Sequence, residues 1–301
     1  MVDSTLDPLE YYTRPGLMTD AQEQASLLAG LPTDVAALCQ VVQGLLLHML
    51  WAERYGVKLP PERRQETEIR RVAQKLRRIQ ELDARPLTVA RPLERRVVSE
   101  CRDFSTLLCA MLRYQGVPAR ARCGFATYFL PDHYEDHWVC EYWQAEEGRW
   151  VMVDAQLDQF QRQVLGIQFD PLDVPSDGFL PAGKAWLLCR AGQADPQKFG
   201  IFDMHGLWFI RGDLVRDVAA LNKTELLPWD GWGLADKEDK DISPADLALL
   251  DQAATLTMAD NRAFPALRAL YENDARLRVP PVIKSYHDTG VEMVEIGGLG
   301  C

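Results

Sequence analysis

The residue best placed to take part in catalysis is Cys101, which stands at the start of a predicted helix. Apolar residues recur at helical spacing after it, and Gly116 followed by Pro118 predicts the end of the helix. These apolar residues are Phe104, Leu107, Leu108, Met111 and Leu112. Unpaired backbone N–H groups and the positive end of the helix dipole stabilise a thiolate in a first turn. We therefore expect a lowered pKa for the Cys101 thiol, which would make it a nucleophile at neutral pH.

A histidine and an aspartate follow at a spacing that fits a base and its orienting acid. A short polar turn separates two runs of strand-forming residues, Asp136–Trp143 and Arg149–Asp154. If the strands pair antiparallel with positions 143 and 148 opposed, His137 falls opposite Asp154. Opposed side chains lie about 4.5–5.5 Å apart at Cβ, so a carboxylate there can orient an imidazole. A cysteine, a histidine and an aspartate in these roles perform acyl transfer through a thioester.

Four other residues are candidates for supporting or substrate-lining roles. Arg102 and Asp103 lie in the first helical turn beside the thiol, where Asp103 suits the dipole. Arg102 could support the thiolate or pair with an acidic neighbour. Trp138 adjoins the candidate histidine, and Trp51 lies near the end of an earlier predicted helix. For Trp51 we favour core packing, and the alternative is that it lines the site or helps an oxyanion hole.

Four segments of the sequence resemble the transglutaminase-like superfamily. They are Cys101–Phe104, the helix end Leu112–Arg120, the strand His137–Val139 and the strand Trp150–Asp154. The resemblance covers about residues 92–158 and implies a papain-like core, in which the nucleophile helix packs on an antiparallel sheet that carries the histidine and aspartate. The superfamily includes cross-linking acyltransferases, peptidases, amidases and catalytically silent relatives, so the resemblance does not choose the reaction.

The helices and strands that the sequence predicts around these residues indicate an α+β chain in three parts. Residues 1–91 read as a helical N-terminal region packed on the core, with one helix over about 33–55 and another over about 61–82. Residues 92–175 form the predicted papain-like or transglutaminase-like core.

Prolines and glycines mark the third part, residues 176–301, as loop-rich. We predict an α+β accessory region of unrecognised type, which could shape or cover the active cleft. Within it, Ser243 followed by Pro244 predicts the start of a helix that continues through Leu256.

Charge is unevenly distributed along the chain. The 301 residues carry a formal net charge of −11, but the segment Lys58–Arg96 holds 12 basic and 6 acidic residues. No recognition motif, aromatic platform or glycine-rich phosphate loop accompanies this basic segment. We therefore favour a solvated face, with docking on the chain's own acidic region, Glu225–Asp251, as the alternative. Nucleic acid is an unlikely partner on this interpretation, and the oligomeric state stays open.

The cysteines and the apolar stretches indicate in which cellular compartment the protein is expected. Seven cysteines without a C-x-x-C pair argue against a disulfide framework or a structural zinc site and fit a reducing compartment. The first residues lack the pattern of a signal peptide, and the longest apolar stretch, Leu45–Ala52, is too short to cross a bilayer. We expect a cytoplasmic protein with no membrane contact, no metal and no cofactor. The cysteines interpreted as structural or incidental are Cys39, Cys109, Cys123, Cys140, Cys189 and Cys301.

Two classes of function fit these features. The first is a cysteine-dependent hydrolase or acyltransferase that acts on amide, peptide or isopeptide bonds of a peptide, a protein or a small amide. Water is the favoured acceptor, and a lysine amine is the alternative. The second is a catalytically silent transglutaminase-like protein that binds or scaffolds. The presence of Cys101, His137 and Asp154 together weighs against the second class.

Overall fold

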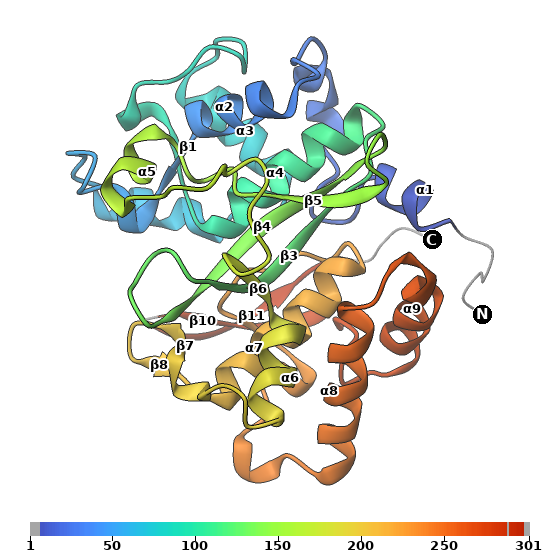
Figure 1. Cartoon of the computed structure of the whole chain (residues 1–301). Coiled ribbons are helices and arrows are strands. Elements are labelled where there is room, and N and C mark those ends of the chain that lie inside the picture. Colours follow the sequence, from blue (N-terminus) through green and yellow to red (C-terminus); the bar gives the residue numbers. More distant parts are fainter. Residues whose placement is uncertain (1–6, 288, 298–301) are drawn as a thin grey trace. The chain divides into compact units, whose positions relative to one another are not determined.

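The computed structural model describes residues 7–287 and 289–297, so Cys301 and the first six residues lie outside the described part (Figure 1). Helices and mainly antiparallel strands both occur, which confirms the predicted α+β class. The chain divides into two compact units. The N-terminal unit comprises Leu9–Ala121 and Trp138–Pro175, and the C-terminal unit contains Arg122–His137, the described residues from Ser176 onward and residues 7–8. The three-part division of the sequence stays a prediction.

The helices of the N-terminal unit gather around α4. Both α2 and α3 pack against it. The Asp34 side chain caps α2 by accepting a hydrogen bond from the Ala37 N–H, 2.9 Å long. The helices are α1 (Pro8–Thr13), α2 (Val35–Leu45), α3 (Val72–Leu82), α4 (Cys101–Tyr114) and α5 (Gln159–Leu165).

The predicted helix over 33–55 is too long. It ends at Leu45, and the chain then enters strand β1 (Leu46–His48), which pairs in parallel with β2 (Val97–Ser99). The segment 61–82 also differs, because it forms a 3-10 helix, Pro61–Glu68, before α3. In the first case a strand partner about fifty positions away overrides the local helical pattern.

The largest sheet has six strands, in the order β6-β3-β4-β7-β8 with β5 paired to β4. Its strands are β3 (Ala119–Ala126), β4 (Tyr134–Gln144), β5 (Arg149–Val153), β6 (Phe179–Pro181), β7 (Phe199–Ile201) and β8 (Met204–His205). Helix α4 lies against β4, since the Sγ atoms of Cys109 and Cys140 are 3.3 Å apart. This confirms a helix that starts at the candidate cysteine and packs on a mainly antiparallel sheet. The contact between these two thiols was not indicated by their spacing in the sequence.

The register predicted for the β4–β5 hairpin is wrong by two residues. Trp143 pairs with Trp150 and Cys140 with Val153, so Asp154 follows the last residue of β5. Gly148 is the reason: it has φ +63° and its N–H donates to the Gln144 carbonyl at 2.9 Å, so it belongs to the turn and not to the strand. Extended by one residue, the observed register sets Asp154 level with Val139, and not with His137.

The C-terminal unit is built mainly of helices around the buried α7. Both α6 and α8 pack against α7. The predicted helix after Ser243 is confirmed, because Ser243 caps α8 and accepts the Asp246 N–H at 3.2 Å. The helices are α6 (Ala182–Arg190), α7 (Leu207–Leu221), α8 (Pro244–Thr257) and α9 (Phe264–Asn273).

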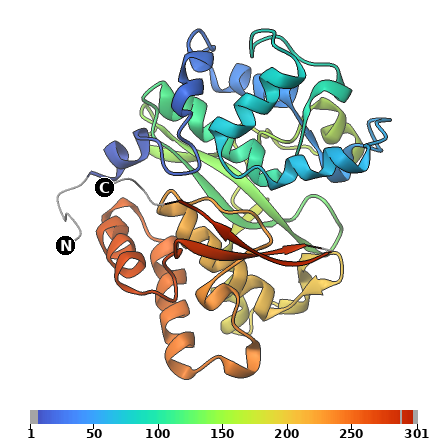
Figure 2. The same ribbon diagram turned by 180° about the vertical axis from the view of Figure 1, so that it is seen from behind.

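A second sheet in this unit has the order β11-β10-β9, and Figure 2 shows β10 and β11 as a long hairpin. Its strands are β9 (Asp230–Gly231), β10 (Val282–His287) and β11 (Gly290–Glu295). Among the described helices of both units, none is long and apolar enough to cross a membrane.

Candidate active site

Cys101 is the first residue of α4, as the sequence predicted. Glu100 caps the helix reciprocally: its side chain accepts the Asp103 N–H, and its own N–H donates to Asp103 Oδ2 at 3.1 Å. Two of the backbone donors at the helix start are therefore held by carboxylates. The thiol lies in the first turn, where the remaining N–H groups and the helix dipole favour negative charge.

The residues next to the thiol form a buried charge cluster. Asp103 accepts hydrogen bonds from Lys75 Nζ and from Arg102 Nη1, each at 2.9 Å, and all three side chains are buried. Arg102 also donates to the Arg70 carbonyl at 2.6 Å. Burial is the largest influence on Lys75 and lowers its pKa, while Asp103 acts in the opposite direction. Of the two roles considered for Arg102, pairing with an acidic neighbour is the one observed.

Removal of the Asp103 carboxylate should destabilise the fold more than removal of an exposed one. Asp103→Ala leaves Lys75 and Arg102 charged and buried without their shared anion. Loss of one partner from a buried ion pair costs about 3–5 kcal/mol of unfolding free energy. Denaturant unfolding measures this loss. The control is Glu147→Ala, which breaks an exposed pair with Arg149 and should cost about 1 kcal/mol or less. Equal losses in the two variants would contradict a structural role for Asp103.

His137 lies in β4 among aromatic rings. Its ring centroid is 4.9 Å from that of Phe129, 6.0 Å from that of Tyr128 and 6.4 Å from that of Phe179, all in edge-on arrangements. These rings restrict the imidazole to few orientations. Trp138, the next residue along β4, is almost completely buried.

Asp154 is held at the end of β5 by hydrogen bonds from both directions of the chain. Its N–H donates to the Pro171 carbonyl at 2.8 Å, and its Oδ1 accepts the Gln156 N–H at 3.0 Å. The carboxylate orientation is therefore fixed by local backbone. Cys101, His137 and Asp154 are 7%, 2% and 2% exposed.

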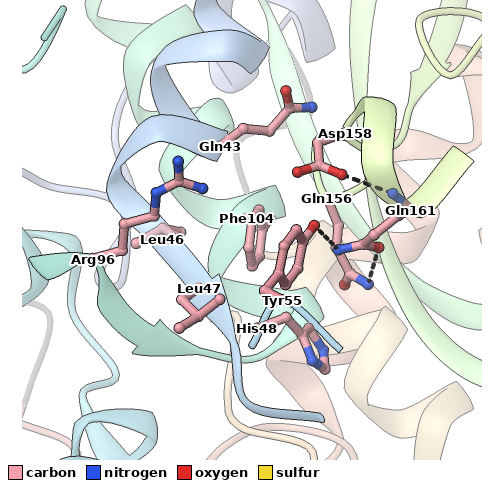
Figure 3. Close-up of a pocket in the computed structure, with 10 residues that line it drawn as sticks. All are labelled: Gln43, Leu46, Leu47, His48, Tyr55, Arg96, Phe104, Gln156, Asp158 and Gln161. Atoms are coloured by element: carbon pink, nitrogen blue, oxygen red, sulfur yellow. Dashed lines mark hydrogen bonds between the residues drawn. The ribbon is translucent and has the colours of Figure 1, made fainter. Parts of the chain in front are cut away.

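A small pocket in the N-terminal unit lies beside the segment that follows Asp154. Its volume of about 10 Å³ has room for about one water molecule. As Figure 3 shows, Gln156 Nε2 donates to Gln161 Oε1 and Gln161 Nε2 donates to the Tyr55 hydroxyl, each at 3.2 Å. Its other lining residues are Gln43, Leu46, Leu47, His48, Arg96, Phe104 and Asp158. A substrate does not fit in this space.

The sequence interpretation missed one pair of residues beside the helix start. His48 Nε2 lies 3.6 Å from Glu100 Oε2, and His48 Nδ1 accepts the Leu50 N–H at 3.2 Å. The pair forms because β1 and β2 align His48 with Ser99, a long-range pairing without a local signal. Glu100 itself could have been noticed, since an acid three positions before Asp103 fits a reciprocal cap. Trp51, the other expected residue of this region, is buried with the Arg54 guanidinium 4.7 Å above its ring.

Comparison with known protein families identifies the domain that carries these residues. Residues 57–155 match the family model described as the transglutaminase-like superfamily, and the matched segment includes Cys101, His137 and Asp154. The resemblance found in the sequence is thereby confirmed by a match to the transglutaminase-like superfamily over residues 57–155. Searches of curated proteins and of solved structures found no match.

Proposed function

We propose that the chain is a cysteine-dependent hydrolase or acyltransferase for amide, peptide or isopeptide bonds. Cys101 is the nucleophile, His137 the general base and acid, and Asp154 the residue that orients His137. The observation that carries the proposal is the position of Cys101 at the first residue of α4 inside a domain of this superfamily. Such a position favours the thiolate form, which is the reactive one.

The reaction proceeds in two halves. The Cys101 thiolate attacks the carbonyl carbon, the C–N bond breaks, and the His137 imidazolium gives its proton to the leaving amine. The product of this half is a thioester on Cys101. In the second half His137 takes a proton from water, the resulting hydroxide attacks the thioester, and the thiolate leaves. A lysine amine in place of water would give transfer instead of hydrolysis, and we favour water.

The proposed role of Asp154 in orienting His137 is supported by the hairpin register, which differs from the predicted one by an even number of residues. A shift of two residues leaves every side chain on the same face of a strand. Asp154, level with Val139, is therefore expected on the face to which His137 also belongs.

The proposal also covers the residues around the triad, the substrate, the partners and the cellular location of the protein. Arg102 and Asp103 are positioning residues, because their contacts hold the start of α4. Trp51 and Trp138 remain candidates for lining the substrate. We further propose a peptide, a protein or a small amide as the substrate, no nucleic-acid partner, and a cytoplasmic location.

The alternative is a catalytically silent domain that binds or scaffolds. The observation in its favour is the burial of Cys101, which leaves little of the thiol accessible to a substrate carbonyl. Thiol reactivity separates the two possibilities, because a silent domain has no need of an activated cysteine.

Alkylation should modify Cys101 before any other thiol at near-neutral pH. Burial raises the pKa of Cys39 to about 12, and the pKa values of Cys123 and Cys140 are also raised well above normal by burial. Cys189 is the most informative comparison for Cys101. It is half-buried, and burial raises its pKa to about 11. Limited iodoacetamide treatment followed by peptide mass spectrometry gives the order. Labelling of Cys189 before Cys101 would mean that access and not thiolate character decides, and would remove the support for an activated Cys101.

A further inference from the structure

A second group of chemically capable side chains lies in the C-terminal unit. Cys123 on β3, Asp136 on β4 and Asp213 on α7 each offer a ligand atom, and these atoms all lie within 4.8 Å of one another. The three residues are 0%, 8% and 1% exposed. They have no part in the mechanism proposed above. They are far apart in the sequence, so their spacing carries no recognisable ligand motif.

The two carboxylates of this cluster are incompletely satisfied. Asp136 Oδ1 and Asp213 Oδ2 are inaccessible to solvent and have no hydrogen-bond partner in the described part of the chain. Asp213 Oδ1, in contrast, accepts from Arg216 Nη1 at 3.1 Å, and the Cys123 thiol also interacts with the Asp213 carboxylate. A buried carboxylate oxygen without a partner is costly, and native proteins normally supply one. Each aspartate thus retains an oxygen that a cation could bind.

The charges around the cluster do not balance. Arg216 pairs with Asp213 and also acts on Asp136 and Cys123, while His137 and Glu135 act on Asp136 in opposite directions. The nearby Arg122 is engaged by Asp217 at 2.9 Å, and Asp217 also accepts the Cys123 N–H at 3.0 Å. When both are ionised, Asp136 and Asp213 exceed the charge of the Arg216 guanidinium by one negative charge.

We propose that Cys123, Asp136 and Asp213 bind a divalent cation of the zinc type. One thiolate, two carboxylates, a divalent ion and the Arg216 guanidinium together carry no net charge. Zinc accepts both sulfur and carboxylate oxygen, at about 2.3 Å and about 2.0–2.2 Å, whereas magnesium and calcium prefer oxygen alone. Binding displaces the thiol proton, and any carboxyl proton, to solvent. The ion would join β3, β4 and α7 and so stabilise this unit.

Metal content tests the proposal directly. The full chain is produced without a metal-binding tag, exposed to Zn²⁺, freed of excess ion by gel filtration and analysed by mass spectrometry of the metals. We expect about one equivalent of zinc in the wild type and in Cys39→Ser, a control that removes a buried thiol outside the cluster. Cys123→Ser and Asp213→Asn should lose the metal. Co²⁺ in place of Zn²⁺ should give a thiolate-to-cobalt charge-transfer band that Cys123→Ser lacks.

Thermal unfolding gives a second readout. A chelator should lower the melting temperature of the wild type and of Cys39→Ser but not that of Cys123→Ser. The proposal is overturned if the wild type retains no zinc and shows no cobalt band, since protons then balance the buried charge. It is also overturned if Cys123→Ser and Asp213→Asn retain as much metal as the wild type. Should these variants fail to fold, the cobalt spectra of Cys39→Ser and Cys101→Ala decide: a band that both keep supports Cys123 as the ligand, and loss of the band in either overturns the proposal.

Discussion

Cys101→Ala should abolish turnover while leaving the fold intact. Without the sulfur no thioester can form, and loss of a nucleophile from a catalytic triad lowers the rate on the order of 10⁴–10⁶-fold. The fold should persist because Cys101 contributes little volume, and the cap of α4 is formed by Glu100 and Asp103. The measurement begins with a library of fluorogenic peptide amides and small amides, from which the best wild-type substrate is taken. Turnover of that substrate and the unfolding curve are then compared between the two proteins.

Cys189→Ala is the matched control for Cys101→Ala. It removes the half-exposed thiol of the C-terminal unit and should leave turnover unchanged. A Cys101→Ala protein that retains a tenth or more of wild-type turnover would show that Cys101 is not the nucleophile. A wild type that is inactive on the whole library and forms no adduct with thiol-directed acylating probes would instead favour the silent binding domain.

The start of α4 could be predicted because its signals are local. Cys101 precedes apolar residues at helical spacing, and the stop signal is real: α4 ends at Tyr114 and Gly116 adopts φ +77°. The hairpin was predicted for the same reason, but its register depended on whether Gly148 belonged to the strand or to the turn. A glycine in the left-handed conformation closes the turn, so the local pattern could have favoured the observed register.

Features that depend on long-range pairing could not be predicted. Strand β1 exists because β2 pairs with it, and this pairing aligns His48 with Ser99, one residue before Glu100. The burial of two cations in the basic segment Lys58–Arg96 also depends on long-range partners. Arg91 is buried and donates to the Asp83 carbonyl at 3.0 Å, and Lys75 is buried against Asp103. A solvated face is therefore wrong for these two cations, since their partners are set by the fold and not by sequence spacing.

Asp154→Asn should slow acylation by about 10²–10⁴-fold, as the loss of an orienting carboxylate does in other triads. The substitution keeps an oxygen that can accept the Gln156 N–H, and it does not alter the backbone N–H that donates to Pro171, so the segment after β5 should retain its shape. The loss should be smaller than for His137→Ala, because asparagine can still hydrogen-bond the ring.

The pH dependence of Cys101 alkylation tests this role without any substrate. A carboxylate beside His137 favours the imidazolium, which in turn supports the Cys101 thiolate. Loss of the carboxylate disfavours the imidazolium, so alkylation should fall most at about pH 6, just below the ordinary pKa of a histidine, and least at alkaline pH. Asp158→Asn is the matched control: it replaces the cap of α5, which accepts the Gln161 N–H at 2.9 Å, and should leave the profile unchanged. If the profile of Asp154→Asn coincides with that of the wild type, Asp154 does not act on His137, and the shared face inferred from the hairpin register does not bring the two side chains together.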